Sequence, residues 1–248
     1  MIVMPIMDLR FIRRRAQMSN EIRVMRTERK YLVSKLQISG LFTRLSAAMA
    51  GDPVNGNRSY MVRSLYFDTI YNDDYFEKMA GIERRQKIRL RIYDVNAKTA
   101  KLEIKEKQGT AQLKRSLIVS RDDAMELQKC NYEVLKKYEE PLAEELYAIM
   151  TTKLYRPACM VEYQRIAFTN YTNDTRITLD SDIRSNEGNF NVFDPKLQMY
   201  PVSDETKMVL EVKYNGFLLS YIKDIVGTIE CHESANSKYC MARKYGLG

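Results

Sequence analysis

Lysine and arginine recur at every second position in short segments that otherwise contain aliphatic residues. Residues 87–93 read Lys-Ile-Arg-Leu-Arg-Ile-Tyr, and residues 101–107 read Lys-Leu-Glu-Ile-Lys-Glu-Lys. Because successive side chains of a β-strand point to opposite faces, each segment would carry its charges on one face and its apolar residues on the other. A guanidinium group grips two phosphate oxygens at once, while an ammonium group acts as a mobile point charge. These residue types therefore suit a chain of phosphates.

The same alternation recurs in four further segments, at residues 28–30, 163–165, 176–180 and 211–213. A few isolated carboxylates lie among the cations, chiefly Glu28, Glu103 and Glu211. Carboxylate oxygens are hard ligands that suit Mg²⁺ or Mn²⁺ bridging phosphates. For each carboxylate taken alone, a salt bridge to a neighbouring cation is the better explanation.

An ordinary antiparallel sheet offers a second interpretation, because such sheets commonly have one apolar face and one wet, charged face. Two observations favour a binding face instead. The charged faces are dominated by Lys and Arg, whereas a merely solvated surface mixes the two signs. Helices with apolar faces also need a surface to cover, and the apolar strand faces supply it. The charged faces must then point at one another or line a closed barrel, and such a lumen would favour a polyanion.

Composition excludes several other chemistries. The 248 residues fit one domain and contain a single histidine, His232, which removes most Ser-His, Cys-His and multi-His metal sites. The four cysteines have no metal-binding or disulfide spacing, so we expect a reducing, cytoplasmic compartment. The net charge is +8, of which +5 lies in residues 1–30. A diffuse basic surface is therefore not expected, and neither is a nucleic-acid partner.

Helices are predicted where capping signals precede apolar residues at helical spacing. Ser34 and Gln37 have the spacing of a capping box before a helix that ends near residue 50, and Ser120 begins a shorter one that ends near Cys130. Further helices are predicted at 140–153 and at 217–227, the latter as the last of the chain. No stretch is apolar for long enough to span a membrane, and the order of the first 15 residues is not that of a secretory signal. We expect a basic leader at 1–21 and one domain at 22–248.

The ordered set of these segments resembles the VTC domain, the polyphosphate polymerase domain of the fungal vacuolar transporter chaperone complex and its stand-alone bacterial relatives. That family lies within the triphosphate tunnel (CYTH-like) group. The resemblance covers about residues 22–245 and rests on segments that occur in the family's order, at 28–32, 62–69, 87–93, 102–107, 163–168, 176–180, 210–213 and 237–239.

The resemblance implies a mainly β (α+β) fold, a closed eight-stranded antiparallel β-barrel tunnel with helices packed on its outside. It implies an enzyme, a metal-dependent phosphotransferase that moves the terminal phosphate of a nucleoside triphosphate such as ATP onto a growing polyphosphate chain. The catalytic cations carried over by motif are Lys30, Arg89, Arg91, Lys105, Lys114, Arg165, Arg176 and Lys238. Arg115 is an alternative to Lys114. Substrate contacts are expected from Tyr163, Ser237, Lys87 and Lys213. The divalent metal, Mn or Mg, is assigned to Glu211, with Glu28 and Glu103 as weaker candidates.

Two departures from the family pattern limit what is carried over. The wider group often begins its first strand with Glu-x-Glu-x-Lys, and Arg26 stands at the first of these positions. This departure argues against a two-metal triphosphatase, which nevertheless stays an alternative, as does a non-catalytic polyphosphate-binding module. The fungal proteins also have an SPX domain and membrane helices that this sequence lacks, so vacuolar translocation is not expected.

Overall fold

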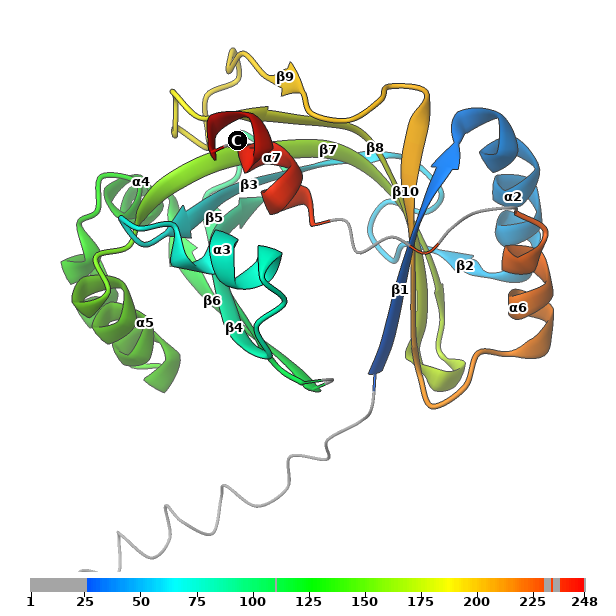
Figure 1. Ribbon diagram of the computed structural model, residues 1–248, viewed down its shortest axis with the longest axis horizontal. Coiled ribbons are helices and arrows are strands. Elements are labelled where there is room, and N and C mark those ends of the chain that lie inside the picture. Colours follow the sequence, from blue (N-terminus) through cyan, green and yellow to red (C-terminus); the bar gives the residue numbers. More distant parts are fainter. Residues whose placement is uncertain (1–25, 110, 230–232, 234–236, 248) are drawn as a thin grey trace, which may run out of the picture.

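The computed structural model describes residues 26–109, 111–229, 233 and 237–247. The expected leader at 1–21 and His232 lie outside these residues. One curved antiparallel sheet organises the chain, in the strand order β1-β10-β8-β7-β3-β4-β5-β6 (Figure 1). Its strands are β1 (Arg26–Ser34), β3 (Tyr60–Asp68), β4 (Arg84–Ile92), β5 (Thr99–Gln108), β6 (Ala111–Ser120), β7 (Arg156–Asn170), β8 (Thr175–Asn186) and β10 (Lys207–Asn215). Two short strands flank this path, β2 (Ala50–Gly51) beside β7 and β9 (Tyr200–Pro201) beside β8.

The register of the strands puts the predicted charged stripes on one face of the sheet. Residues directly opposite in an antiparallel pair point to the same face. Arg89 pairs with both Tyr66 and Glu103, and Lys105 pairs with Lys87 and Lys114. Towards the other end of the strand order, the aligned positions on the same face include Lys30 with Glu211, Lys213 with Arg176 and Arg165 with Asp180. We call this concave face the inner face.

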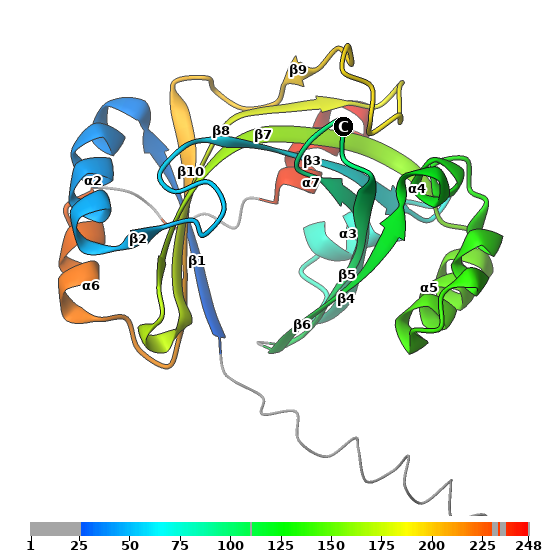
Figure 2. The same cartoon turned by 180° about the vertical axis from the view of Figure 1, so that it is seen from behind.

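Four helices cover the outer, apolar face in two groups, seen at the two sides of the sheet in Figure 2. Helices α2 (Lys35–Ala48) and α6 (Ser220–Gly227) pack over β1, β10 and β8, where Leu45, Ile222 and Leu210 are fully buried. Helices α4 (Arg121–Leu127) and α5 (Pro141–Thr152) pack over β4, β5 and β6 together with the 3₁₀ helix η1 (Tyr132–Lys137). The alternating strands expose aliphatic residues on this side, so burying them is the driving force for both layers.

The predicted helices are confirmed, with boundaries close to those expected. Ser34 caps α2 and forms the capping box with Gln37, while the Ser120 hydroxyl accepts the backbone N–H of Asp123 at the start of α4. Four helical elements were not predicted: α3 (Asp73–Met79), η1, the 3₁₀ helix η2 (Thr172–Asp174) between β7 and β8, and α7 (Lys238–Leu247). The helix at 217–227 is therefore not the last of the chain.

Helix α7 corrects the expectation that all helices lie outside the sheet. Its Tyr239 and Ala242 are buried against inner-face residues, among them Val161 and Val209. The inner face is charged over only part of its length, and beyond that part it is apolar. Burying this apolar part favours a helix on the concave side, where Figure 1 shows α7 lying across the arch of the strands.

The sheet is also not closed into a barrel, which corrects the expected closed tunnel. Among the described strands, β1 pairs only with β10 and β6 only with β5, so these two strands are the edges of the path. An isolated bridge also joins Tyr31 of β1 to Glu233. The inner faces near both edges carry lysines, and like charges placed directly opposite oppose strand pairing. Side chains approach instead: Lys105 Nζ of β5 lies 3.2 Å from Glu28 Oε2 of β1. The inner face is therefore the floor of a groove in one open sheet. The two ends of the strand order form its sides, and we call them the β1–β10 limb and the β4–β5–β6 limb.

Candidate functional site

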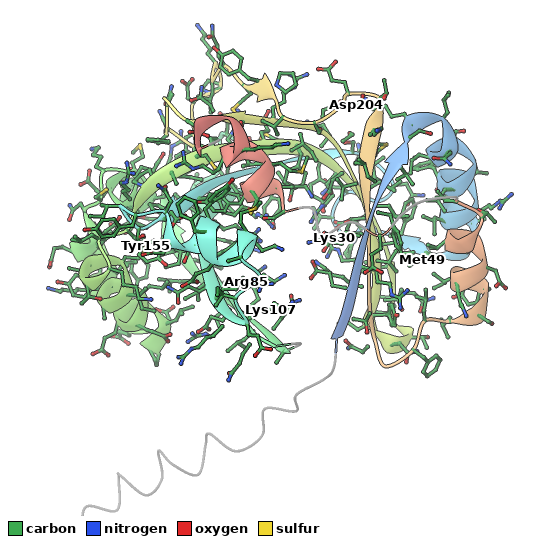
Figure 3. The ribbon with its side chains drawn as sticks, in the orientation of Figure 1. Lys30, Met49, Arg85, Lys107, Tyr155 and Asp204 are labelled. Carbon is green, nitrogen blue, oxygen red and sulfur yellow. The ribbon has the colours of Figure 1, made fainter. Side chains whose placement is uncertain are left out.

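A cavity of about 440 Å³ opens between the limbs. Its lining comes from both limbs, from α3 and from the residues before α7: Glu28, Lys30, Lys78, Arg85, Gln86, Lys87, Lys105, Lys107, Gln112, Glu233 and Ser237. Figure 3 shows Lys30 on β1 and, across the opening, Arg85 on β4 and Lys107 on β5. Cations outnumber carboxylates in this lining, so the cavity favours an anionic ligand.

Glu103 is the centre of a cation cluster in the β4–β5–β6 limb. Its side chain is only 1% exposed, and its carboxylate accepts from Arg89 Nε at 2.7 Å and pairs with Lys114. Arg91 Nη1 lies 3.9 Å from the same carboxylate. Burial by itself raises the pKa of Glu103, but the adjacent Arg89, Arg91 and Lys114 outweigh it and hold the pKa at about 2. Glu103 is thus ionised at neutral pH and holds three predicted cations together.

The same limb distinguishes Lys114 from its neighbour Arg115. Lys114 faces inward onto Glu103, whereas Arg115 faces outward and pairs with Glu106 and with Glu145 of α5. The alternation of strand β6 accounts for the difference, because adjacent residues must point to opposite faces. The sequence left these two residues as alternatives, and only the partner strand decides which of them is inside.

Glu28 and Glu211 form a second cluster, in the β1–β10 limb. Glu28 Oε1 lies 2.8 Å from Lys30 Nζ, and Glu211 Oε1 lies 2.5 Å from Lys213 Nζ. For both carboxyl groups burial raises the pKa, but the surrounding lysines, Lys213 foremost, lower it further than burial raises it. Burial lowers the pKa of Lys30, and the two carboxylates more than reverse that effect. Glu28, Glu211 and Lys30 are therefore charged at neutral pH.

Lys105 connects the two limbs. Burial lowers its pKa to about 8, with Lys213 and Lys30 acting in the same direction and Glu28 opposing them. Its ammonium group therefore loses its proton at a lower pH than an ordinary lysine would. A bound phosphate chain would add negative charge beside Lys105 and so favour its protonated form.

Asp180 forms a third cluster that the sequence analysis did not assign to the site. Its side chain is fully buried and accepts two hydrogen bonds from Arg165, at 2.6 and 2.7 Å. Lys238 Nζ, at the start of α7, lies 2.5 Å from the same carboxylate. Asp180 stands in the 176–180 stripe, so its inward direction was predictable. Its partner on α7 was not, because no local pattern says which helix crosses the inner face.

The remaining predicted residues lie nearby in three different settings. Lys87 Nζ donates to Ser237 Oγ at 2.7 Å, and both residues line the cavity. Tyr163 is buried, and its hydroxyl accepts from Arg91 Nη2 at 3.3 Å, so it supports a cation beneath the groove. Arg176 lies outside the cavity lining and pairs with Asp52 at 3.1 Å.

The cavity itself therefore gathers only some of the predicted residues, namely Glu28, Lys30, Lys87, Lys105 and Ser237. Most of the others belong to the three ion-paired clusters. Lys238 reaches its cluster from α7, and Arg176 pairs with Asp52 outside them. Sequence reasoning missed Lys78 and Arg85 as site residues. Lys78 comes from an unpredicted helix, and Arg85 lies just before the segment at 87–93 whose alternation was recognised.

The donor atoms near Glu211 are compatible with a divalent cation. Glu28 and Glu211 are ionised carboxylates on adjacent strands, and Thr178, directly opposite Glu211, has a buried hydroxyl oxygen with no partner among the described residues. Within that part of the chain, no group of three or more His, Cys, Asp or Glu side chains is arranged to hold a metal. Mg²⁺ and Mn²⁺ fit two carboxylates when substrate oxygens and water supply the other ligands.

A strongly curved antiparallel sheet with a cation-rich concave face is the architecture expected of the triphosphate tunnel group. The model of the VTC domain family matches residues 25–246, and the chain belongs to this family. The fold is similar to that of a "putative adenylate cyclase" from Bacillus halodurans, at 13% identity and a TM-score of 0.51, over 91% of this chain and 98% of that one. A protein from Pyrococcus horikoshii OT3 aligns at 10% identity and a TM-score of 0.43, over 88% of this chain and 99% of that one.

A search of curated proteins finds no match to the sequence. In the part of the chain that the structure describes, no helix combines the length and the apolar character needed to cross a membrane.

Proposed function

We propose that this protein is a polyphosphate polymerase, which transfers the terminal phosphate of a nucleoside triphosphate such as ATP onto a growing inorganic polyphosphate chain. The observation that supports it best is the excess of cations on one face of the sheet, gathered around a groove that a linear polyanion can enter. Membership of the VTC domain family supports the same assignment.

In phosphoryl transfer, the main roles of the protein are to position the two reacting phosphates and to stabilise the charge that develops between them. A terminal oxygen of the polyphosphate chain attacks the terminal phosphorus of the nucleotide, the bond to the bridging oxygen breaks, and the nucleoside diphosphate leaves. No histidine is needed, because the attacking phosphate oxygen is already ionised. Arg89 and Arg91 provide planar donors to equatorial oxygens, and Lys30 and Lys105 provide charge from the two sides of the cavity.

The carboxylates then act as counter-ions that offset the repulsion among the cations of the groove. Glu103 and Asp180 are buried among the cations that phosphate would contact. Each bound phosphate would therefore take the place of a carboxylate as the partner of a cation that is already paired. We propose Glu211 and Glu28 as the ligands of the divalent metal and Glu103 as a counter-ion, because the nearest groups around Glu103 are three cations. A bound Mn²⁺ or Mg²⁺ would neutralise charge that develops between the phosphates.

A triphosphatase is the alternative enzyme, since water and a phosphate chain compete for the same in-line position. A hydrolase of the two-metal type would need a further carboxylate on the first strand, where this chain has Arg26. A non-catalytic polyphosphate-binding module is the third candidate. It would use the same cations and need no metal.

Incubation of the protein with ATP and Mn²⁺, followed by gel electrophoresis, separates the three functions. The proposal expects long phosphate chains and an equal release of ADP. Free phosphate would indicate a hydrolase, and unchanged ATP a binding module. Arg91→Gln should abolish the product, while Lys129→Gln, which removes an exposed cation paired with Glu126 on the outer surface, should leave it unchanged.

A further inference from the structure

Among the described residues, four of the cations that line the cavity have no carboxylate partner. Lys87 is one of them, and its ammonium group donates to Ser237 Oγ at 2.7 Å. The other three lie further out, and of these Arg85 donates to the backbone oxygen of Ile82. Lys78 at the end of α3, Arg85 at the start of β4 and Lys107 near the end of β5 line the cavity and are half-buried. Among the described residues, no carboxylate oxygen lies within 4.0 Å of their charged nitrogens. We call these three residues the rim cations.

Apart from Lys87, the deeper cations are already paired with carboxylates. Arg89 and Lys114 contact Glu103, Arg165 and Lys238 contact Asp180, and the lysines of the β1–β10 limb share Glu28 and Glu211. A half-buried cation without such a partner is unfavourable beside others of its sign. The pKa of Lys107 reflects this cost. Burial is the main cause that lowers this pKa, and the neighbouring charges of Arg85 and Lys78 lower it further.

The strand register places Arg85 and Lys107 at one end of the groove, and Lys78 of α3 lines the same cavity. Arg85 pairs with Lys107, two positions further along the strands than the pair of Lys87 with Lys105. From Arg89 to Arg85 the distance along β4 is about 13 Å, at about 3.3 Å per residue. A ligand that contacts both Arg89 and Arg85 must be long, and it must be anionic along its whole length. Figure 3 shows Arg85 and Lys107 together on this side of the opening.

We propose that Lys78, Arg85 and Lys107 form an accessory subsite for long-chain inorganic polyphosphate, which holds the chain beyond the phosphates that occupy the paired cations. This inference rests on the proposed function, because it names where the growing chain leaves the site. The rim cations act on retention of the chain and not on the transfer step. They therefore determine how long the product becomes before it is released.

The binding test compares long-chain inorganic polyphosphate with tripolyphosphate, by calorimetry in the absence of metal, for wild type and for the triple variant Lys78→Gln/Arg85→Gln/Lys107→Gln. We expect the variant to lose at least about tenfold in affinity for the long chain, since each lost hydrogen bond to a charged group contributes about that much. Affinity for tripolyphosphate should change by less than about twofold, because the paired cations are intact. The slope of log Kd against log salt should fall by about two, at about 0.7 per phosphate contact on a flexible chain.

The matched control removes the same charge elsewhere. Lys129, Lys136 and Lys223 are exposed residues on or beside the outer helices and the 3₁₀ helix, and the variant with Gln at all three should bind both ligands as wild type does. The rim variant should melt at or above the wild-type temperature, because it removes mutual repulsion. The single variants Lys78→Gln and Lys107→Gln, measured in the same way, keep the test decisive if the triple variant is unstable.

Unchanged affinity for the long chain would overturn the subsite. So would an equal loss for both ligands, which would place the rim cations in the same site as the paired ones. The proposed function is tested separately by the product from ATP. If wild type makes no polyphosphate but the rim variant binds the long chain more weakly than wild type, the polymerase is refuted and the subsite stands. If wild type makes polyphosphate and the rim variant binds the long chain as tightly as wild type, only the subsite is refuted.

Discussion

Glu103→Gln tests whether the buried carboxylate holds the cations of the β4–β5–β6 limb in place. The substitution keeps the size of the side chain and removes its charge, which leaves Arg89, Arg91 and Lys114 facing one another. Folding lowers the pKa of Glu103 from 4.5 to about 2. A change of one pKa unit corresponds to about 1.4 kcal/mol, so the charged form contributes about 3 kcal/mol to the free energy of unfolding.

The pH dependence of this contribution has a definite sign. Because the folded-state pKa is depressed, the stabilisation is fully present above pH 4.5 and is lost as the pH falls from 4.5 towards 2. Urea unfolding followed by far-ultraviolet circular dichroism should give a free energy of unfolding about 3 kcal/mol lower for Glu103→Gln than for wild type at pH 7. The difference should be the same at pH 6 and should shrink below pH 4.5.

A matched control and a ligand measurement complete this test. Glu126→Gln removes a carboxylate that pairs with Lys129 on the outer surface, and it should leave the unfolding midpoint nearly unchanged. Tripolyphosphate should raise the melting temperature of Glu103→Gln by more than that of wild type, because phosphate no longer competes with the carboxylate. Equal unfolding midpoints for Glu103→Gln and wild type at pH 7 would refute the reasoning.

Three further predictions concern turnover and binding. Arg89→Lys or Arg91→Lys should lower the rate of ADP release although the charge is kept, because an ammonium group cannot replace a planar fork; wild-type rates in both would contradict their contact with phosphate. Glu211→Gln should keep the fold and tripolyphosphate affinity but lose most Mn²⁺-dependent turnover, whereas a large fall in melting temperature with metal dependence retained would make Glu211 structural and leave Glu28 as the metal candidate. Tripolyphosphate affinity should fall as the pH rises through about 8, where Lys105 loses its proton, and Lys105→Arg should flatten that profile; a profile that is already flat in wild type would exclude a role for Lys105 in binding.

Alternation along the strands is what the sequence by itself determined most securely. The side-chain period of two grouped the charged residues of segments such as 87–93 and 101–107 on one face before any strand pairing was known, and the register places those residues together on the inner face. The capping signals at Ser34 and Ser120 were equally secure, because a cap is satisfied by residues three positions away. Both kinds of signal are local, so the chain's own spacing is sufficient.

Only the tertiary structure decided whether the sheet closes, what lies on its concave side and which carboxylate neutralises which cation. A closed barrel was expected, but β1 and β6 remain edges, because the inner faces near them bring lysines towards one another. A side-chain contact between Glu28 of β1 and Lys105 of β5 spans the gap. Helix α7 crosses the inner face because the apolar residues there, contributed by several strands, form a patch only after the sheet has assembled. Asp180 meets Lys238 and Arg85 joins Lys107 for the same reason, since each contact depends on curvature and register that no single segment encodes.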